Sequence, residues 1–261
     1  MSNLAATLGK QGKLDEAASM KKEVLEKRQR ILGDEHPDTI AAMNNLAATL
    51  GDQGKLDEAA LMKKEVLKKM QRILGDEHPN TITAMSNLAI TLDNQGKLDE
   101  AASMRKEVLE KRQRILGNEH PDTIAAMSNL AITLGDQGKL DEAALMKKEV
   151  LEKRQRILGD KHPETIMAMN NLAITLGNQG KLDEAVLIIK EVHEKRQRIL
   201  GDEHPDTIMA MNNLAATLGN QGKLDEAIGP PDVSTTKKQP FLKRVTGKLQ
   251  KVRNSYRFSA N

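Results

Sequence analysis

Five histidines recur at an interval of 42 residues and are the side chains in this sequence best suited to bind a metal ion. A zinc site draws its ligands to within about 2 Å of one ion, whereas packed helices lie about 8–10 Å apart. Histidines in equivalent positions of successive copies are therefore too far apart to share an ion. We interpret them as turn or helix-capping residues and expect no metal site. They are His36, His78, His120, His162 and His204.

Other patterns that could support catalysis or cofactor binding fail on their spacing. Residues 51–56, GDQGKL, superficially match a phosphate-binding loop, but the glycines are too close together, no Ser or Thr follows Lys55, and no strand pattern precedes them. The chain has no cysteine, so disulfides, thiolate metal sites and cysteine nucleophiles are excluded. No Ser–His–acid set or catalytic pair of carboxylates is evident. We therefore predict that the protein is not an enzyme and uses no cofactor and no small-molecule substrate.

The elements that would position any such residue are copies of one 42-residue block. The block begins at Met1, Met43, Met85, Met127 and Met169, and a partial copy begins at Met211. A fixed period of this length indicates a solenoid, in which each copy stacks on its neighbours and presents an open surface. We divide the chain into an array over 1–228 (copies 1–42, 43–84, 85–126, 127–168, 169–210 and partial 211–228), a linker over 229–239 and a basic amphipathic or disordered tail over 240–261.

Each copy carries the pattern of two helices. The first, of about 16 residues, begins at Pro37, where a missing N–H is tolerated, and ends by Gly54. The second, of about 19 residues, opens with Asp57 and Glu58, whose charge suits a helix N-terminus, and stops at Gly75. Because no period-2 pattern is present, the predicted fold class is all-α. The expected buried stripes are Ile40, Met43, Leu46, Ala47 and Leu50 in the first helix and Leu56, Ala59, Met62, Val66 and Ile73 in the second.

The repeated letters also carry a family resemblance. The stretch N-L-A-x-x-L-x-x-Q-G-K-L-x-E-A, followed by a second helix and G-D-E-H-P, resembles a tetratricopeptide repeat, and the 42-residue form most resembles the kinesin light chain type. This resemblance implies a right-handed superhelical solenoid of antiparallel helix pairs, with the first helices lining a concave face that binds peptides. The chain has Leu8 and Leu14 where the family often has aromatic residues, so we expect a less bulky core. The matching packing positions are Leu4, Ala5, Leu8, Gly12, Leu14 and Ala17.

Arrays of near-identical copies are also similar to the repeat ends of fungal receptors that carry an NB-ARC or NACHT nucleotide switch. This sequence contains no such switch. The resemblance therefore implies an alternative function, the ligand-sensing arm of a NOD-like receptor without its nucleotide-binding part. Binding to a kinesin motor is not implied, because the heptad segment that contacts the motor in that family is absent from this sequence.

The predicted binding surface lies on the first helix of each copy, opposite its buried stripe. In the third copy this face carries Thr83, Ser86, Asn87, Ile90 and Asn94, which are small, neutral or amide-bearing. Asn can donate to and accept from a peptide backbone. Two alternatives stay open: the Ile residues could fill gaps between helices, and the Asn residues could bridge neighbouring helices. The candidate groove residues are Asn45, Asn87, Ile90, Asn94, Asn129, Ile132, Asn171, Ile174 and Asn178.

The net charge of +3 conceals a basic tail, since residues 229–261 carry eight Lys or Arg and one acid, Asp232. Four apolar residues from 242 to 252 would share one face of a helix, and a basic amphipathic helix can lie on an anionic membrane or a protein partner. A disordered tail is the alternative. Nucleic acid is not an expected partner, because no recognition motif accompanies the charge. The candidate contact residues are Lys243, Arg244, Lys248 and Lys251.

The sequence as a whole predicts a non-catalytic scaffold that binds a protein or peptide partner in the groove of the array. A membrane-surface adaptor anchored by the tail is a further alternative. No apolar run approaches the roughly 20 residues that span a bilayer, and no basic-then-apolar leader opens the chain. We therefore expect the protein to be cytoplasmic.

Overall fold

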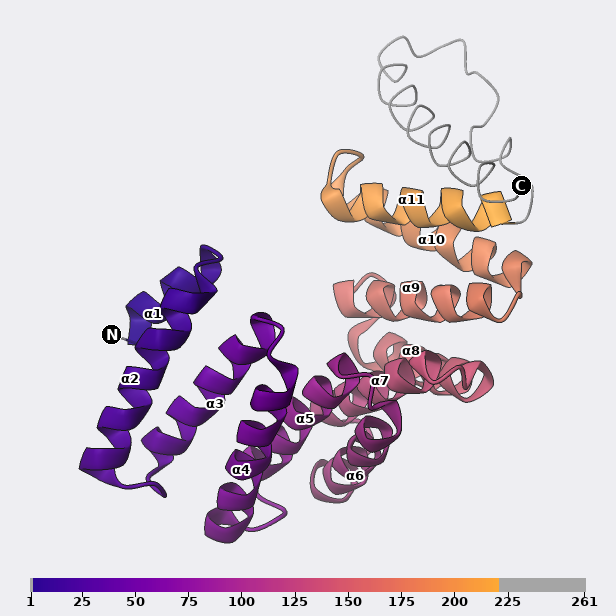
Figure 1. Ribbon diagram of the computed structural model, residues 1–261. Helices are drawn as coiled ribbons and strands as arrows, with labels where there is room; N and C mark the ends of the chain where they lie inside the picture. The colour runs from indigo at the N-terminus through magenta and orange to yellow at the C-terminus, as the bar shows by residue number, and fades with distance from the viewer. Residues whose placement is uncertain (1, 221–261) are drawn as a thin grey trace, which may run out of the picture. The chain divides into compact units, whose positions relative to one another are not determined.

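The computed structural model describes residues 2–220, without the side chains of residues 2, 3 and 6, and these residues form eleven α-helices and no strand (Figure 1). The predicted all-α class is confirmed. Two helix types alternate along the chain, a shorter one, here the A helices, and a longer one, the B helices. The A helices are α1 (Ser2–Lys10), α3 (Pro37–Asp52), α5 (Pro79–Asn94), α7 (Pro121–Asp136), α9 (Pro163–Asn178) and α11 (Pro205–Asn220). The B helices are α2 (Leu14–Leu32), α4 (Leu56–Leu74), α6 (Leu98–Leu116), α8 (Leu140–Leu158) and α10 (Leu182–Leu200).

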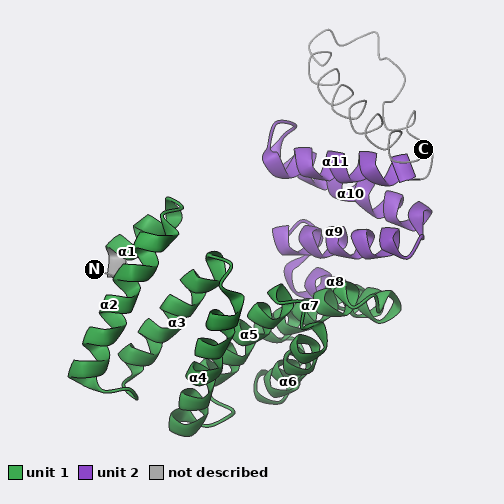
Figure 2. Ribbon diagram, in the orientation of Figure 1, with its two compact units in different colours: residues 1–153 green, residues 154–261 purple. Residues whose placement is uncertain are grey.

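The chain divides into two compact units, unit 1 over residues 1–153 and unit 2 over residues 154–261 (Figure 2). In unit 1, each helix from α1 to α7 packs on its neighbours in the sequence. In the described part of unit 2, α9 and α11 both pack on α10. Each unit is therefore a stack of helix pairs joined by short turns, which is the arrangement that the repeat predicts.

Helix boundaries follow Pro, His and Gly residues that recur in each copy. Pro is the first residue of every A helix from α3 onward. The His before it is the N-cap, as in α5, where the backbone N–H of Asn80 donates to His78 Nδ1 at 3.1 Å. The equivalent bond is present at 3.1–3.2 Å for His36, His120, His162 and His204. The capping interpretation of these histidines is thus confirmed.

The core of each unit is built from aliphatic side chains of both helix types. A larger share of the aliphatic side chains is buried in the A helices than in the B helices. Leu88 and Leu92 of α5 are each 1% exposed. In α4, the expected stripe residues Ala59 and Val66 are buried, whereas Ile73 is 42% exposed, which corrects the prediction. The reason is length, because α4 has 19 residues and α5 has 16. Three extra residues lengthen α4 by about 4.5 Å relative to α5, and both apolar residues of its last turn, Ile73 and Leu74, are exposed.

Arginines near the end of the B helices hold the start of the next A helix. Arg28 Nη1 donates to the backbone oxygen of Asp38 at 2.7 Å. Met70 occupies the equivalent position in α4, so this helix lacks the bond. The same bond is present at 2.8, 3.1 and 2.9 Å in the pairs Arg112–Asp122, Arg154–Glu164 and Arg196–Asp206.

His193 in α10 stands where α2, α4 and α6 bury Leu25, Leu67 and Leu109. Its side chain is half-buried, and its Nδ1 atom has no hydrogen-bond partner within the described residues. A buried polar atom without a partner costs free energy. We therefore expect this substitution to weaken the local packing of α10.

Candidate protein-binding surface

One face of each A helix from α3 onward is partly exposed and carries the residues that the sequence singled out. We define the A-helix face by four positions, at intervals of four, three and four residues, which in α5 are Thr83, Asn87, Ile90 and Asn94. The equivalent Ile side chains are surface residues, because Ile90 is 46%, Ile132 41% and Ile174 43% exposed. By comparison, Leu88 on the opposite side of the same helix is 1% exposed.

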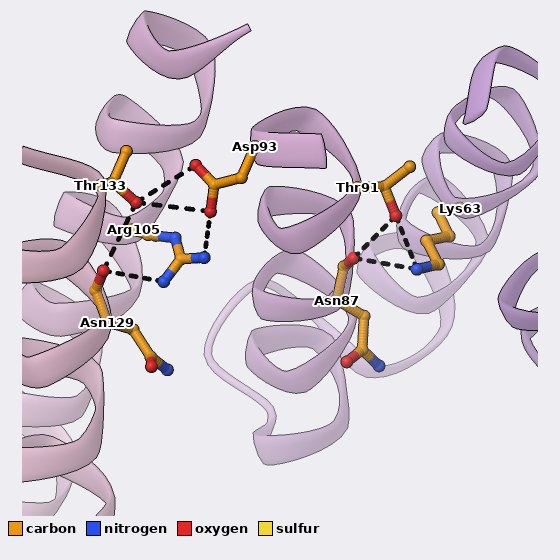
Figure 3. Close-up of polar contacts among 7 residues, drawn as sticks. All are labelled: Lys63, Asn87, Thr91, Asp93, Arg105, Asn129 and Thr133. Atoms are coloured by element: carbon orange, nitrogen blue, oxygen red, sulfur yellow. Dashed lines mark hydrogen bonds and ion pairs between the residues drawn. The ribbon is translucent and has the colours of Figure 1, made fainter. Parts of the chain in front are cut away.

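The Asn residues of this face differ in their surroundings. Asn45, Asn94, Asn129 and Asn178 are exposed, whereas Asn87 and Asn171 are half-buried. The side-chain amides of Asn87 and Asn129 point away from the polar contacts made by their own backbone oxygens (Figure 3). In unit 2, a bond between helices is present: Asn213 Nδ2 of α11 donates to Asn170 Oδ1 of α9 at 3.1 Å.

A row of cations from the B helices lies beneath this face in unit 1. We call Lys21, Lys63 and Arg105 the cation ladder. Lys63 Nζ donates to Thr91 Oγ1 at 2.7 Å and to the backbone oxygen of Asn87 at 3.2 Å (Figure 3). Lys21 makes the equivalent bond to the backbone oxygen of Asn45 at 3.3 Å, and Arg105 to that of Asn129 at 2.8 Å. The ladder therefore fixes the backbone of each Asn.

Burial affects the ionisation of two lysines of the B helices, Lys63 of the ladder and Lys147 of α8. Partial burial lowers the pKa of Lys63, and the nearby carboxylate of Asp52 opposes part of that effect. Burial lowers the pKa of Lys147 in the same way, with Asp136 in the opposing role. Removing an ammonium group from water disfavours its charged form, so each hydrogen-bond acceptor near these lysines helps to stabilise their charged form.

The third copy departs from the others at two positions that contact each other. Asp93 stands where the second and fourth copies have Gly51 and Gly135, and Arg105 stands where the second has Lys63. The two side chains form an ion pair and are only 16% and 11% exposed (Figure 3). Thr133 Oγ1 of α7 also donates to Asp93 Oδ1 at 3.2 Å. Sequence reasoning missed this cluster, although two departures within one copy are a signal for it.

The chemistry available on this surface is that of recognition. Within residues 2–220, no group of three or more His, Asp or Glu side chains is placed to hold a metal ion. No helix in the described range is long and apolar enough to cross a membrane. The predicted tail contacts Lys243, Arg244, Lys248 and Lys251, and the predicted linker over 229–239, lie outside the described residues.

The fold and this open face define the class of the protein, a helical repeat array. Family models of the tetratricopeptide repeat match residues 1–72, 62–110 and 94–156, and also 165–206 and 207–229. The chain therefore belongs to the tetratricopeptide repeat family, whose repeats generally mediate protein–protein interactions and are typically non-catalytic.

Solved structures with the same fold include proteins of the kinesin light chain type. One is a protein of Podospora anserina described as a kinesin light chain with nearly identical TPR-like repeats, with TM-score 0.68, 23% identity and coverage of 82% of this chain and 98% of that one. Another is BtubC (BKLC) from P. vanneervenii, with TM-score 0.70, 22% identity and coverage of 91% and 92%. A tetratricopeptide repeat protein from Parabacteroides merdae matches with TM-score 0.59, 18% identity and coverage of 87% and 74%. No curated protein matches the chain.

Proposed function

We propose that the protein is a non-catalytic scaffold that binds a peptide segment of a protein partner along the A-helix face. The observation that carries this proposal is the recurrence of an exposed Ile beside an Asn whose backbone is held from below. Ile90 with Asn87 and Ile132 with Asn129 repeat the arrangement in unit 1, and Ile174 with Asn171 repeats the residue pair in unit 2. The Ile side chains would contact apolar residues of the peptide.

The spacing of the Asn row suits an extended peptide. Successive A helices lie about 10 Å apart in such stacks, and an extended chain rises about 3.3 Å per residue. Asn45, Asn87 and Asn129 of unit 1 would therefore meet about every third peptide residue. Amides that bind backbone groups place few demands on the peptide sequence, so specificity would come from the Ile positions.

Other functions remain predictions from the sequence. The receptor-arm alternative, a ligand-sensing repeat array without its nucleotide-binding part, depends on the resemblance alone. The membrane-adaptor alternative depends on Lys243, Arg244, Lys248 and Lys251, which lie outside the described residues. A cytoplasmic location is part of the proposal. Of the three functions, only peptide binding in the groove is supported by residues that the structure describes.

The proposal can be tested with a displayed library of random 16-residue peptides selected on the full chain. We expect the enriched peptides to bind at least about tenfold more weakly to Ile132→Asp, because a carboxylate would be placed against the apolar side chain that Ile132 contacts. Leu145→Asp is the matched control: Leu145 is 73% exposed, on a B helix of the same unit. Peptides that bind both variants as well as the original chain would disprove binding at this face.

A further inference from the structure

The A-helix face of unit 2 differs from that of unit 1 in having no charge and more apolar surface. In α9 and α11, three large apolar side chains stand on this face, Met167, Ile174 and Met209, and they are 44%, 43% and 45% exposed. We call these three residues the Met–Ile patch. The two helices lie side by side, since both pack on α10 and Asn213 bonds to Asn170. The patch is thus one surface within one unit.

Acidic residues border this patch at the start of both helices. The segments 159–164 and 201–206 carry five acids and one lysine, Lys161. Glu164 and Asp206 are exposed in the first turns of α9 and α11, and each lies one helical turn before a methionine of the patch. Arg154 and Arg196 are buried beneath these turns and bond to backbone oxygens. Arg154 Nη2 also lies 3.5 Å from Glu164 Oε2, so that carboxylate is partly balanced within the chain and the other four acids carry most of the charge of the border.

A surface of this kind fits a basic amphipathic segment, and the chain contains one. Residues 240–253 read PFLKRVTGKLQKVR and contain no acid. Leu242, Val245, Leu249 and Val252 follow the i, i+3, i+7, i+10 spacing of one helical face. Five cations lie between and beside them, which matches an apolar patch with an acidic border.

The length of chain after α11 allows this segment to reach the patch. Nineteen residues, 221–239, separate Asn220 from Pro240. The predicted linker, residues 229–239, makes up eleven of them and could by itself span up to about 36 Å, whereas α11 with its 16 residues is about 24 Å long. A segment tethered in this way acts at an effective concentration near the millimolar range, so modest affinity suffices for occupancy.

We propose that residues 240–253 bind to the Met–Ile patch of the same chain, with their apolar face on Met167, Ile174 and Met209 and their cations toward the acidic border. The segment then covers the part of the A-helix face that the proposed function assigns to a partner in unit 2. It is a competitor of the partner within the chain, and a partner must displace it. Competition with a partner rests on the proposed function, whereas binding of residues 240–253 to the Met–Ile patch can be tested without it.

Because the chain has no cysteine, cysteine pairs introduced into the full chain can test this directly. Ala216→Cys places a thiol on the A-helix face beside the patch, and Thr246→Cys places one at the edge of the apolar face of the segment. The control pair is Thr246→Cys with Leu187→Cys, because Leu187 is 68% exposed on α10. We expect the 216–246 disulfide to form at least about tenfold faster than the 187–246 disulfide, within monomers and independently of protein concentration.

Adding Ile174→Asp to the 216–246 cysteine pair should slow disulfide formation to the rate of the 187–246 pair. Adding Leu145→Asp, in unit 1, should leave the rate of disulfide formation unchanged. Equal rates for the two pairs, or disulfides only between chains, would overturn the proposal. Binding of the full chain to phosphatidylserine vesicles, combined with equal rates in their absence, would assign the segment to a membrane surface and would also overturn it. None of these readouts involves a peptide partner, so failure here is distinct from failure of the proposed function.

Discussion

At the scale of single residues, the third copy shows how a charge is accommodated under the binding face. Asp93 replaces a glycine and would be a poorly solvated carboxylate without its ion pair to Arg105. In the second copy, Gly51 and Lys63 take the same positions, and Lys63 uses only neutral acceptors of α5. The two substitutions of the third copy therefore compensate for each other, because each charged side chain is the ion-pair partner of the other.

This coupling predicts a double-mutant cycle. Arg105→Met should reduce the free energy of unfolding by about 3 kcal/mol, because it leaves a largely buried carboxylate without its cation. The same change made together with Asp93→Gly should cost less than the sum of the single changes, with a coupling of at least about 1 kcal/mol. Urea denaturation measures each value, and strictly additive effects would show that the pair is not coupled.

The lowered pKa of Lys63 predicts how the free energy of unfolding changes with pH. Burial lowers its pKa in the folded chain below the ordinary value of 10.5. Between the two values the unfolded chain binds more protons than the folded chain, so the free energy of unfolding rises with pH. The contribution of Lys63, measured as the difference between the original chain and Lys63→Met, should therefore increase as the pH approaches 10.5. Lys64→Met, on the exposed side of the same helix, is the control, and a difference that falls with pH would contradict the prediction.

At the scale of the helices, glycine sets where each B helix ends. Gly117 follows α6 with φ 87° and ψ 166°, a region that is essentially restricted to glycine. An added Cβ at this position would meet no atom within 4 Å. The requirement for glycine is therefore one of backbone conformation and not of space.

Gly117→Ala isolates that requirement. We expect the substitution to lower the free energy of unfolding by about 1–3 kcal/mol, since Ala is strained at these angles. Gly135→Ala in the interior of α7 is the matched control, with a helical backbone and an ordinary 3.9 Å contact to Ala143. That change should be neutral or stabilising by up to about 1 kcal/mol. Equal changes in the free energy of unfolding for Gly117→Ala and Gly135→Ala, measured by thermal or urea denaturation, would contradict a conformational requirement for glycine at position 117.

At the scale of the molecule, stability within a unit is a sum of similar local terms. Each helix of unit 1 packs on its neighbours in the sequence, and the contacts that join α2 to α3 recur between α4 and α5. Removing one complete copy should therefore bring together surfaces that already match.

Deletion of residues 85–126 tests this additivity. The cut joins the first turns of α5 to the rest of α7 and regenerates a complete A helix that begins at Pro79. We expect the shortened chain to fold with the same helical content per residue and with a urea m-value lower by about a sixth, in proportion to the surface lost. Loss of a cooperative transition would show that the third copy has a role that the others cannot fill.

The repeat, the helix pairs and their boundaries could all be predicted from the order of the residues alone. Pro37 begins α3, and Gly75 follows the last residue of α4, as their backbone preferences require. The 3.6-residue period placed Leu46 and Leu50 in the core, and both are buried. These features depend on interactions within one helix or one turn, which short stretches of sequence encode.

The side chains at the edge of each stack, and the polar contacts between its helices, follow from how the helices pack and could not be predicted from the repeat pattern. Ile73 has the spacing of a core residue but is exposed, because burial there depends on the length of the neighbouring helices. The contacts of Lys63 with Thr91 and of Arg105 with Asp93 join different helices. Their partners lie 28 and 12 residues away in the chain, and they meet only because the packing of A and B helices fixes the distance between their backbones.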